Sequence, residues 1–134
     1  MVKITGEYQG DLHCVATHEP SGNSLVTDAP KDNQGRGEAF SPTDLLATAF
    51  ATCVCTIVAM AARVKGVDLK GLRYEVQKEM TPPPRRVASL TLTLWLPPAA
   101  KAVPQEILER AAHSCPVHQS LAPEVEKRIE FRWE

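Results

Sequence analysis

The sequence has no excess of charge of either sign, no internal repeat and no low-complexity tract. Its 134 residues include 15 Lys and Arg and 16 Asp and Glu, which give a formal net charge of −1. Proteins that bind nucleic acids or anionic lipid surfaces concentrate positive charge, whereas this chain spreads both signs along its length. We therefore predict no nucleic-acid or membrane partner, and a single domain over residues 1–134 that is large enough to bury a core.

The start of the chain also lacks a secretion signal. Residues 1–10, MVKITGEYQG, do not show a positively charged segment followed by an apolar one, so we expect a cytoplasmic protein. Cysteines in that compartment are mostly reduced, which argues against a structural disulfide framework. Free cysteine is among the most buried residue types, so an inert buried thiol is the default interpretation. The four cysteines are Cys14, Cys53, Cys55 and Cys115.

One long run of the chain, residues 45–62, carries no charge at all. Its 18 residues reach the length of a membrane-spanning helix, but six of them are Ala and three are Thr. The run is also the only one of its kind, and amphipathic segments flank it on both sides. We therefore interpret it as a helix that is buried on all sides, at the centre of a fold or of an interface.

Local signals mark both ends of this helix. Ser41 can cap it, Pro42 suits the first helical position, and Asp44 completes a capping box. Gly66 supplies a left-handed stop. The sequence thus predicts a helix over residues 42–65.

Strand-like alternation precedes and follows the helix, and a shorter amphipathic helix is predicted at residues 103–115. The predicted strands are residues 2–8, 12–18, 23–29, 72–80, 87–97 and 125–133. This order predicts an α+β fold in which an antiparallel sheet wraps around a long apolar central helix. One such sheet is too small to cover that helix on every side, so we expect a homodimer.

Two of the cysteines lie in the apolar helix itself. Residues i and i+2 of a helix are about 200° apart, so Cys53 and Cys55 point to opposite faces. They cannot form a dithiol or bind one metal ion together without unwinding the helix. At least one of them should therefore be structural.

Cys115 differs from these two because Pro116 follows it. This order predicts that Cys115 lies at a helix N-terminus, where unpaired N–H groups favour the thiolate. His113 and His118 are near in sequence and could act as general bases or metal ligands. His118 could equally be an exposed histidine, or one with another partner.

Two segments in combination resemble the OsmC/Ohr family of osmotically inducible and organic hydroperoxide resistance proteins. They are SPTDLLATAFATCVCTIVAMAA at residues 41–62 and AAHSCPVHQSL at residues 111–121. The spacing and the element order match over nearly the whole chain. The resemblance implies an intertwined homodimer with two packed central helices and two active sites at the interface. It also implies that Cys53 is the peroxidatic cysteine, Cys115 the resolving one, and Cys55 a packing residue.

The sequence departs from the family at the residues that assist the first thiol. The family's glutamate, one residue after the helix-initial proline, would fall at Thr43, and the first strands contain no arginine. Asp44 is adjacent, but the capping box is expected to use it. We predict Arg36 and Glu38 as the substitutes, because both lie in the loop before the helix and Glu38 could orient the guanidinium of Arg36.

The resulting functional prediction is a thiol-dependent peroxidase that reduces organic hydroperoxides. A thiolate attacks the O–O bond and becomes a sulfenic acid, a second thiol forms a disulfide, and a dithiol reductant restores both. Neither a cofactor nor a metal is required. One alternative is a small-ligand-binding or carrier dimer with weak or no peroxidase activity, which Thr43 favours. Another is a catalytic zinc site formed by Cys53, Cys115 and His118.

Overall fold

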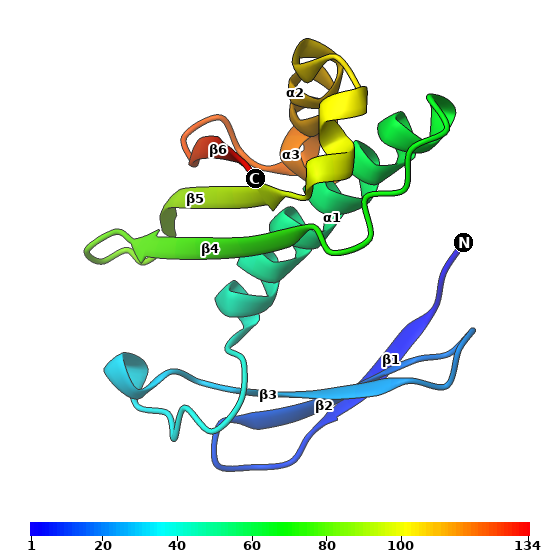
Figure 1. Cartoon of the computed structure of the whole chain (residues 1–134). Coiled ribbons are helices and arrows are strands. Elements are labelled where there is room, and N and C mark those ends of the chain that lie inside the picture. The colour runs from blue at the N-terminus through cyan, green and yellow to red at the C-terminus, as the bar shows by residue number, and fades with distance from the viewer. The chain divides into compact units, whose positions relative to one another are not determined.

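The structure is a computed structural model that describes every residue from Met1 to Glu134. It contains six β-strands, three α-helices and two short 3-10 helices, which confirms the predicted α+β class (Figure 1). The chain divides into two compact units, Met1–Leu46 and Ala47–Glu134, and the division falls inside the longest helix. That the whole chain forms one domain stays a prediction.

The first unit contains an antiparallel sheet in the order β1-β2-β3. Its strands are β1 (Ile4–Tyr8), β2 (His13–His18) and β3 (Ser24–Asp28). The turn between β1 and β2 includes Gly10, whose φ of 85° lies in the left-handed region that glycine adopts at little cost. After this turn, His13 begins β2 directly opposite Asp28 at the end of β3.

A loop with a short 3-10 helix, η1 (Lys31–Asn33), leads from β3 to the long helix α1 (Pro42–Val64). Ser41 Oγ accepts the backbone N–H of Asp44 (3.0 Å), and Asp44 Oδ2 accepts the N–H of Ser41 (2.9 Å). These reciprocal bonds are the predicted capping box, which satisfies donors that a helix start leaves unpaired. At the other end, Gly66 has a left-handed φ of 76°. Both predicted ends of the helix are therefore confirmed to within a residue.

α1 is buried along one face and exposed along the opposite one. Val54, Val58 and Ala62 are fully buried, whereas Thr52, Thr56 and Met60 are exposed. The hydroxyl of Thr52 donates to the Thr48 carbonyl, and the hydroxyl of Thr56 donates to the Thr52 carbonyl, each at 2.8 Å. Within a single chain, the predicted burial on all sides is therefore met on one side only.

By length and composition α1 could also cross a membrane, and 33% of its most apolar window is buried inside the protein. The core helix of a soluble protein passes the same test, so this finding is weak evidence for a span. The fully buried stripe is typical of a helix packed against its own chain.

The second unit contains a sheet in the order β4-β5-β6, with strands β4 (Arg73–Met80), β5 (Val87–Leu96) and β6 (Glu126–Trp133). β4 and β5 are antiparallel, but β5 and β6 are parallel, so the sheet is mixed rather than antiparallel throughout. The segment between β5 and β6 forms a helical crossover, which is the connection that parallel strands require. Alternation in a sequence predicts the buried face of a strand but carries no information about its direction.

The crossover contains a 3-10 helix, η2 (Pro98–Ala102), and two α-helices, α2 (Gln105–His113) and α3 (Pro116–Ser120). Their apolar residues join those of β5 and α1 in one core. The fully buried members of β5 and α2 are Leu90, Leu92, Leu94, Leu96, Leu108 and Ala112. Burial of each leucine contributes about 1.5–3 kcal/mol relative to exposure. This core fixes the part of α1 from Ala47 onward and the start of α3 in the second unit.

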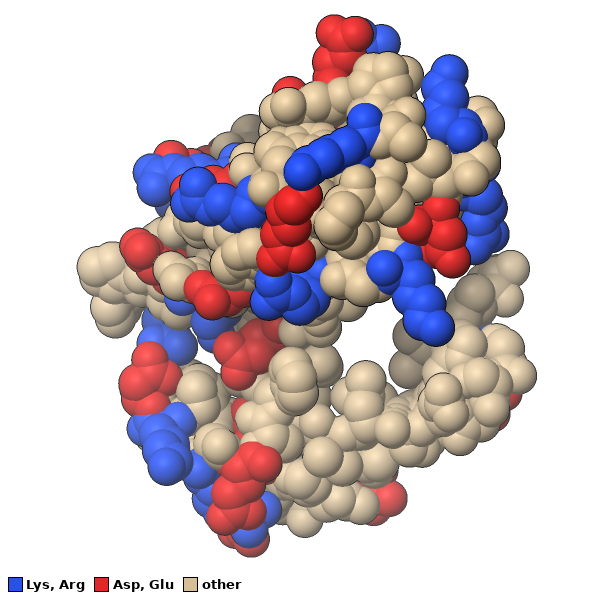
Figure 2. All heavy atoms as spheres, viewed as in Figure 1, with Lys and Arg blue, Asp and Glu red and all other residues tan.

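The charged side chains of both signs are interspersed on the face drawn in Figure 2. On β6, Arg128 pairs with Glu126 (2.7 Å) and Arg132 pairs with Glu130 (3.0 Å). Exposed pairs of this kind contribute little to stability, about 0–1 kcal/mol each. Their effect is to keep the exposed face of the strand near neutrality.

Candidate functional site

The second unit brings Cys53 and Cys115 together from distant parts of the sequence. Cys53 lies in α1 and is half-buried, whereas Cys115 immediately precedes α3 and is fully buried. The two thiols are close enough for Cys53 to raise the pKa of Cys115, and all four cysteines of the chain are free. The two residues that sequence reasoning selected are therefore in contact, while their roles in chemistry stay a prediction.

Cys115 is the N-cap of α3, as the following proline predicted. Its Sγ accepts the backbone N–H of His118 at 3.2 Å, and Pro116 occupies the first helical position. Burial nevertheless raises the pKa of Cys115, and the nearby Cys53 thiol raises it further, against the lowering effect of the His118 N–H. The expectation that a helix N-terminus would favour the thiolate here is therefore wrong in its net effect. Cys115 is a protonated thiol at neutral pH.

His118 is the aromatic neighbour of this thiol pair. Its ring centroid lies 6.0 Å from that of Phe50 in α1, and 5.8 Å from that of His113 in an edge-on arrangement. Burial lowers the pKa of His118, and the charges of Lys127 and His113 lower it further. His118 is therefore neutral at neutral pH.

The structure contains no group of three His, Cys, Asp or Glu side chains that could hold a metal ion. The zinc alternative required such a group from Cys53, Cys115 and His118. Although these residues are neighbours, His118 turns its ring toward Phe50 and His113. The zinc site predicted as an alternative is therefore not formed.

The loop residues Arg36 and Glu38 are both exposed, and no ion pair joins their side chains. Glu38 instead donates its backbone N–H to Asp28 Oδ2 at 3.0 Å. They belong to the first unit and Cys53 belongs to the second, so a contact with the thiol stays a prediction. Thr43 hydrogen-bonds with Ser41 (3.2 Å between hydroxyl oxygens), and Asp44 is used by the capping box, as expected.

A His–Asp pair in the first unit was missed by sequence reasoning. Asp28 is only 2% exposed, and its Oδ1 lies 2.5 Å from His13 Nδ1. The hydrogen bond to His13 lowers the pKa of Asp28 most strongly, with further lowering by the Glu38 N–H and by the charge of Arg36. The backbone N–H of Asp28 also donates to the Phe40 carbonyl (3.1 Å), so Asp28 fixes both the end of β3 and the end of the loop.

Asp28→Asn is expected to reduce the stability of the protein at neutral pH, because the amide cannot replace an ionised acceptor. A carboxyl with a lowered folded-state pKa stabilises the fold above its unfolded pKa of about 3.9, and this stabilisation is lost as pH falls through the folded value. The difference in melting temperature between wild type and variant should therefore shrink in acid. Circular dichroism melts of both proteins, from neutral pH into acid, measure this difference. Asp68→Asn, at an exposed carboxylate, is the control.

The remaining cysteines differ from the pair. Burial raises the pKa of Cys55 to about 11, and this half-buried thiol borders a hollow of about 340 Å³ beside Leu69. A thiol that is so hard to ionise is a poor nucleophile, which supports its interpretation as a packing residue. Cys14 is exposed on β2.

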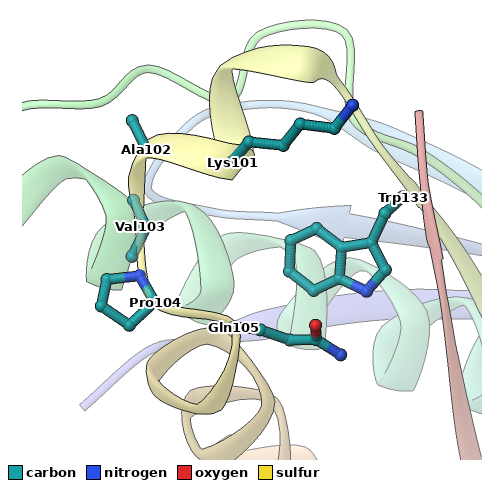
Figure 3. Close-up of a pocket in the computed structure, with 6 residues that line it drawn as sticks. All are labelled: Lys101, Ala102, Val103, Pro104, Gln105 and Trp133. Carbon is teal, nitrogen blue, oxygen red and sulfur yellow. The ribbon is translucent and has the colours of Figure 1, made fainter.

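A larger hollow of about 510 Å³ lies where η2 meets α2 in the second unit. Figure 3 shows the Lys101 side chain and the Trp133 ring at its edges, and its other lining residues are Ala102, Val103, Pro104 and Gln105. The indole nitrogen of Trp133 is buried without a hydrogen-bond partner. None of the predicted site residues lines this hollow.

Comparison with known proteins gives a family and a set of similar folds. The model of the OsmC-like protein family matches residues 35–130. A solved structure from Psychrobacter arcticus, whose name proposes an osmotic-stress and detoxification response, shares 41% identity and a TM-score of 0.90, over 98% of this chain and 96% of that one. No curated protein matches.

Two further solved structures have a similar fold at low identity. An organic hydroperoxide resistance protein of Legionella pneumophila has 18% identity and a TM-score of 0.70, over 98% of this chain and 96% of that one. The organic hydroperoxide resistance protein of Bacillus subtilis has 17% identity and a TM-score of 0.73, over 98% of each chain. At this identity the likeness concerns the fold.

Proposed function

The chain belongs to the OsmC-like protein family, and from this premise we propose that it is a thiol-dependent peroxidase that reduces organic hydroperoxides. The observation that carries the proposal is the proximity of the Cys53 and Cys115 thiols, which interact inside an apolar unit. Proteins named for organic hydroperoxide resistance have a similar fold, which supports the choice of substrate class.

In the first step, the Cys53 thiolate attacks the distal oxygen of the hydroperoxide. The O–O bond breaks, the sulfur becomes a sulfenic acid, and the alkoxide leaves as an alcohol after taking a proton. Cys53 suits this role because it is half-buried and so reachable from solvent, whereas Cys115 is fully buried and protonated. A dithiol reductant would return the oxidised pair to two thiols.

We further propose that the working form is a homodimer. The exposed face of α1 carries no charge from Leu45 to Ala62, and Met60 on it is 55% exposed. A second copy of the chain would remove this apolar surface from water, and stable interfaces of this kind bury more than about 2,000 Å². Light scattering at micromolar concentration should give twice the mass of one chain, and a monomer would contradict the proposal. A cytoplasmic location also stays a prediction.

Arg36 and Glu38 remain the proposed assistants of the Cys53 thiolate. Arg36→Lys keeps the positive charge but loses the planar fork of the guanidinium, so it should lower the rate of peroxide reduction, by roughly tenfold. Arg132→Lys provides the comparison, because Arg132 is an exposed arginine paired with Glu130 on β6. If the two variants reduce peroxide at the same rate, Arg36 has no catalytic role.

Thiol counting after treatment with an organic hydroperoxide tests the proposed function. The reduced protein is exposed to one equivalent of cumene hydroperoxide, and the free thiols per chain are counted before and after. Loss of two thiols, mapped to Cys53 and Cys115 by mass spectrometry, is the expected result. Retention of all thiols would overturn the proposal.

A small-ligand carrier is the second candidate, and the hollow beside Trp133 favours it. A volume of about 510 Å³ is in the range of small-molecule sites, and the hollow has an amine at its edge. Retention of all thiols in the preceding experiment would point to this function instead.

A further inference from the structure

A contact between two aromatic rings joins the segments that carry the two thiols. Phe50 lies three residues before Cys53, and His118 lies three residues after Cys115. Residues three apart in a helix lie on the same side, so Phe50 sits one turn from Cys53 on the same side of α1. The rings of Phe50 and His118 lie 6.0 Å apart with an angle of 42° between their planes.

His118 also holds Cys115 through its backbone. Its N–H donates to Cys115 Sγ at 3.2 Å, which fixes the direction of the thiol at the start of α3. Phe50 is fully buried and cannot shift without disturbing the core. A short segment of five residues, α3, is therefore anchored to α1 by the His118 ring, and the thiol that precedes it is held against Cys53.

On the basis of the proposed function, we propose that His118 is a positioning residue for disulfide closure: its neutral ring, packed on Phe50, holds the Cys115 thiol against Cys53, and protonation of the ring weakens this contact. The reaction concerned is the second step of the cycle. The Cys115 sulfur attacks the sulfur of the Cys53 sulfenic acid, the S–O bond breaks and an S–S bond forms. The hydroxyl leaves with the former thiol proton as water, so no further reactant is needed.

The charged groups around the ring explain why a proton would weaken the contact. Lys127 of β6 and His113 of α2 both oppose a positive charge on His118, and burial opposes it more strongly than either. From α1 the ring meets Phe50, which carries no charge, and the Cys115 thiol at the start of α3 is protonated at neutral pH. Because the packed ring disfavours the proton, linkage requires that the proton disfavours the packed ring. The contact is favoured above the ordinary histidine pKa of about 6.5 and is weakened as pH falls below it.

The experiment separates the second step from the first. Wild type, His118→Phe and His118→Ala are oxidised with one equivalent of cumene hydroperoxide between about pH 5 and pH 8, on either side of the ordinary histidine pKa. Samples are quenched with dimedone, which traps sulfenic acid, and mass spectrometry gives the rate at which sulfenic acid becomes disulfide. Formation of Cys53 sulfenic acid in the wild type reports the proposed function itself. Its absence would refute that function, whereas the closure rate tests only His118.

We expect His118→Ala to close the disulfide about tenfold to a hundredfold more slowly, because misplacement by about 1 Å is enough for such losses. His118→Phe keeps a ring against Phe50, so it should close at the wild-type rate at the alkaline end. Because the attacking species is the Cys115 thiolate, the closure rate of every variant should fall with its thiolate fraction as pH falls, which is a dependence on one proton. Below the histidine pKa the closure rate of the wild type should fall more steeply, because a second proton binds to His118. His118→Phe lacks that group and should keep the one-proton dependence.

His113→Phe is the matched variant, because it keeps the edge-on ring but removes a charge that lowers the pKa of His118. In this variant, the steeper fall of the closure rate should begin at a higher pH than in the wild type. Two outcomes would overturn the inference. One is closure by His118→Phe as slow as by His118→Ala at the alkaline end, which would assign proton transfer rather than positioning to the ring. The other is an unchanged pH profile in His118→Phe. Circular dichroism spectra confirm that each variant is folded.

Discussion

Cys53→Ser is expected to abolish turnover of organic hydroperoxides, by on the order of a thousandfold or more, because the serine hydroxyl cannot replace the thiolate as nucleophile. Cys115→Ser should give a different result. It leaves Cys53 able to react once, so each chain should consume about one equivalent of hydroperoxide and then stop with a sulfenic acid. Consumption of hydroperoxide against enzyme concentration, with dimedone labelling of the stopped protein, distinguishes the two.

Cys55→Ser is the matched control, since Cys55 lies in the same helix two residues away on another face. It should lose about 1 kcal/mol of stability if the new hydroxyl finds no partner, and keep its turnover. Loss of turnover in a folded Cys55→Ser protein would show that the assignment of the two helix faces is wrong. Normal multiple turnover by Cys115→Ser would show that another group resolves the sulfenic acid.

Phe50→Ala is expected to lower the free energy of unfolding by about 3–5 kcal/mol, the range for a large buried side chain that leaves a cavity. Phe50 is 0% exposed. It lies among the fully buried residues of α1 and supports the His118 ring, so the surroundings cannot collapse onto the cavity without moving the thiol pair. Urea unfolding followed by circular dichroism measures the loss.

Phe40→Ala provides the comparison, because Phe40 is 53% exposed and should change the unfolding free energy far less, by roughly 0.5 kcal/mol or less for an ordinary surface site. Phe50→Leu retains most of the volume and should cost less than Phe50→Ala. Similar losses for Phe40→Ala and Phe50→Ala would contradict the position of Phe50 in the core.

The features that sequence reasoning predicted correctly depend on neighbours in the chain. The capping box of Ser41 and Asp44 and the stop at Gly66 each need only a few adjacent residues, and α1 begins and ends accordingly. Pro116 suits the first position of a helix, so the place of Cys115 just before α3 also follows from a local signal. The contact of Cys53 with Cys115 is not local, and the family resemblance supplied that prediction.

The features that were missed depend on which segments meet in space. The parallel direction of β6 follows from the crossover and leaves no trace in the alternation of Ile129, Phe131 and Trp133. The pairing of His13 with Asp28 requires the register of two strands. The raised pKa of Cys115 depends on burial by the whole unit, which outweighs the N–H groups of a helix start.

The two threonines on the exposed face of α1 bear on how that face responds to losing its water. Polar surface usually resists dehydration because its donors must find new acceptors. Thr52 and Thr56 already donate to carbonyls of their own helix, so they present mainly methyl groups outward and keep their bonds whether the face is wet or dry. The helix can thus pass from water into an apolar contact without any side chain on that line changing its hydrogen-bond partner. Valine at either position would retain the shape of the exposed face. The only hydrogen bond lost would be the one from the hydroxyl to a carbonyl of the same helix.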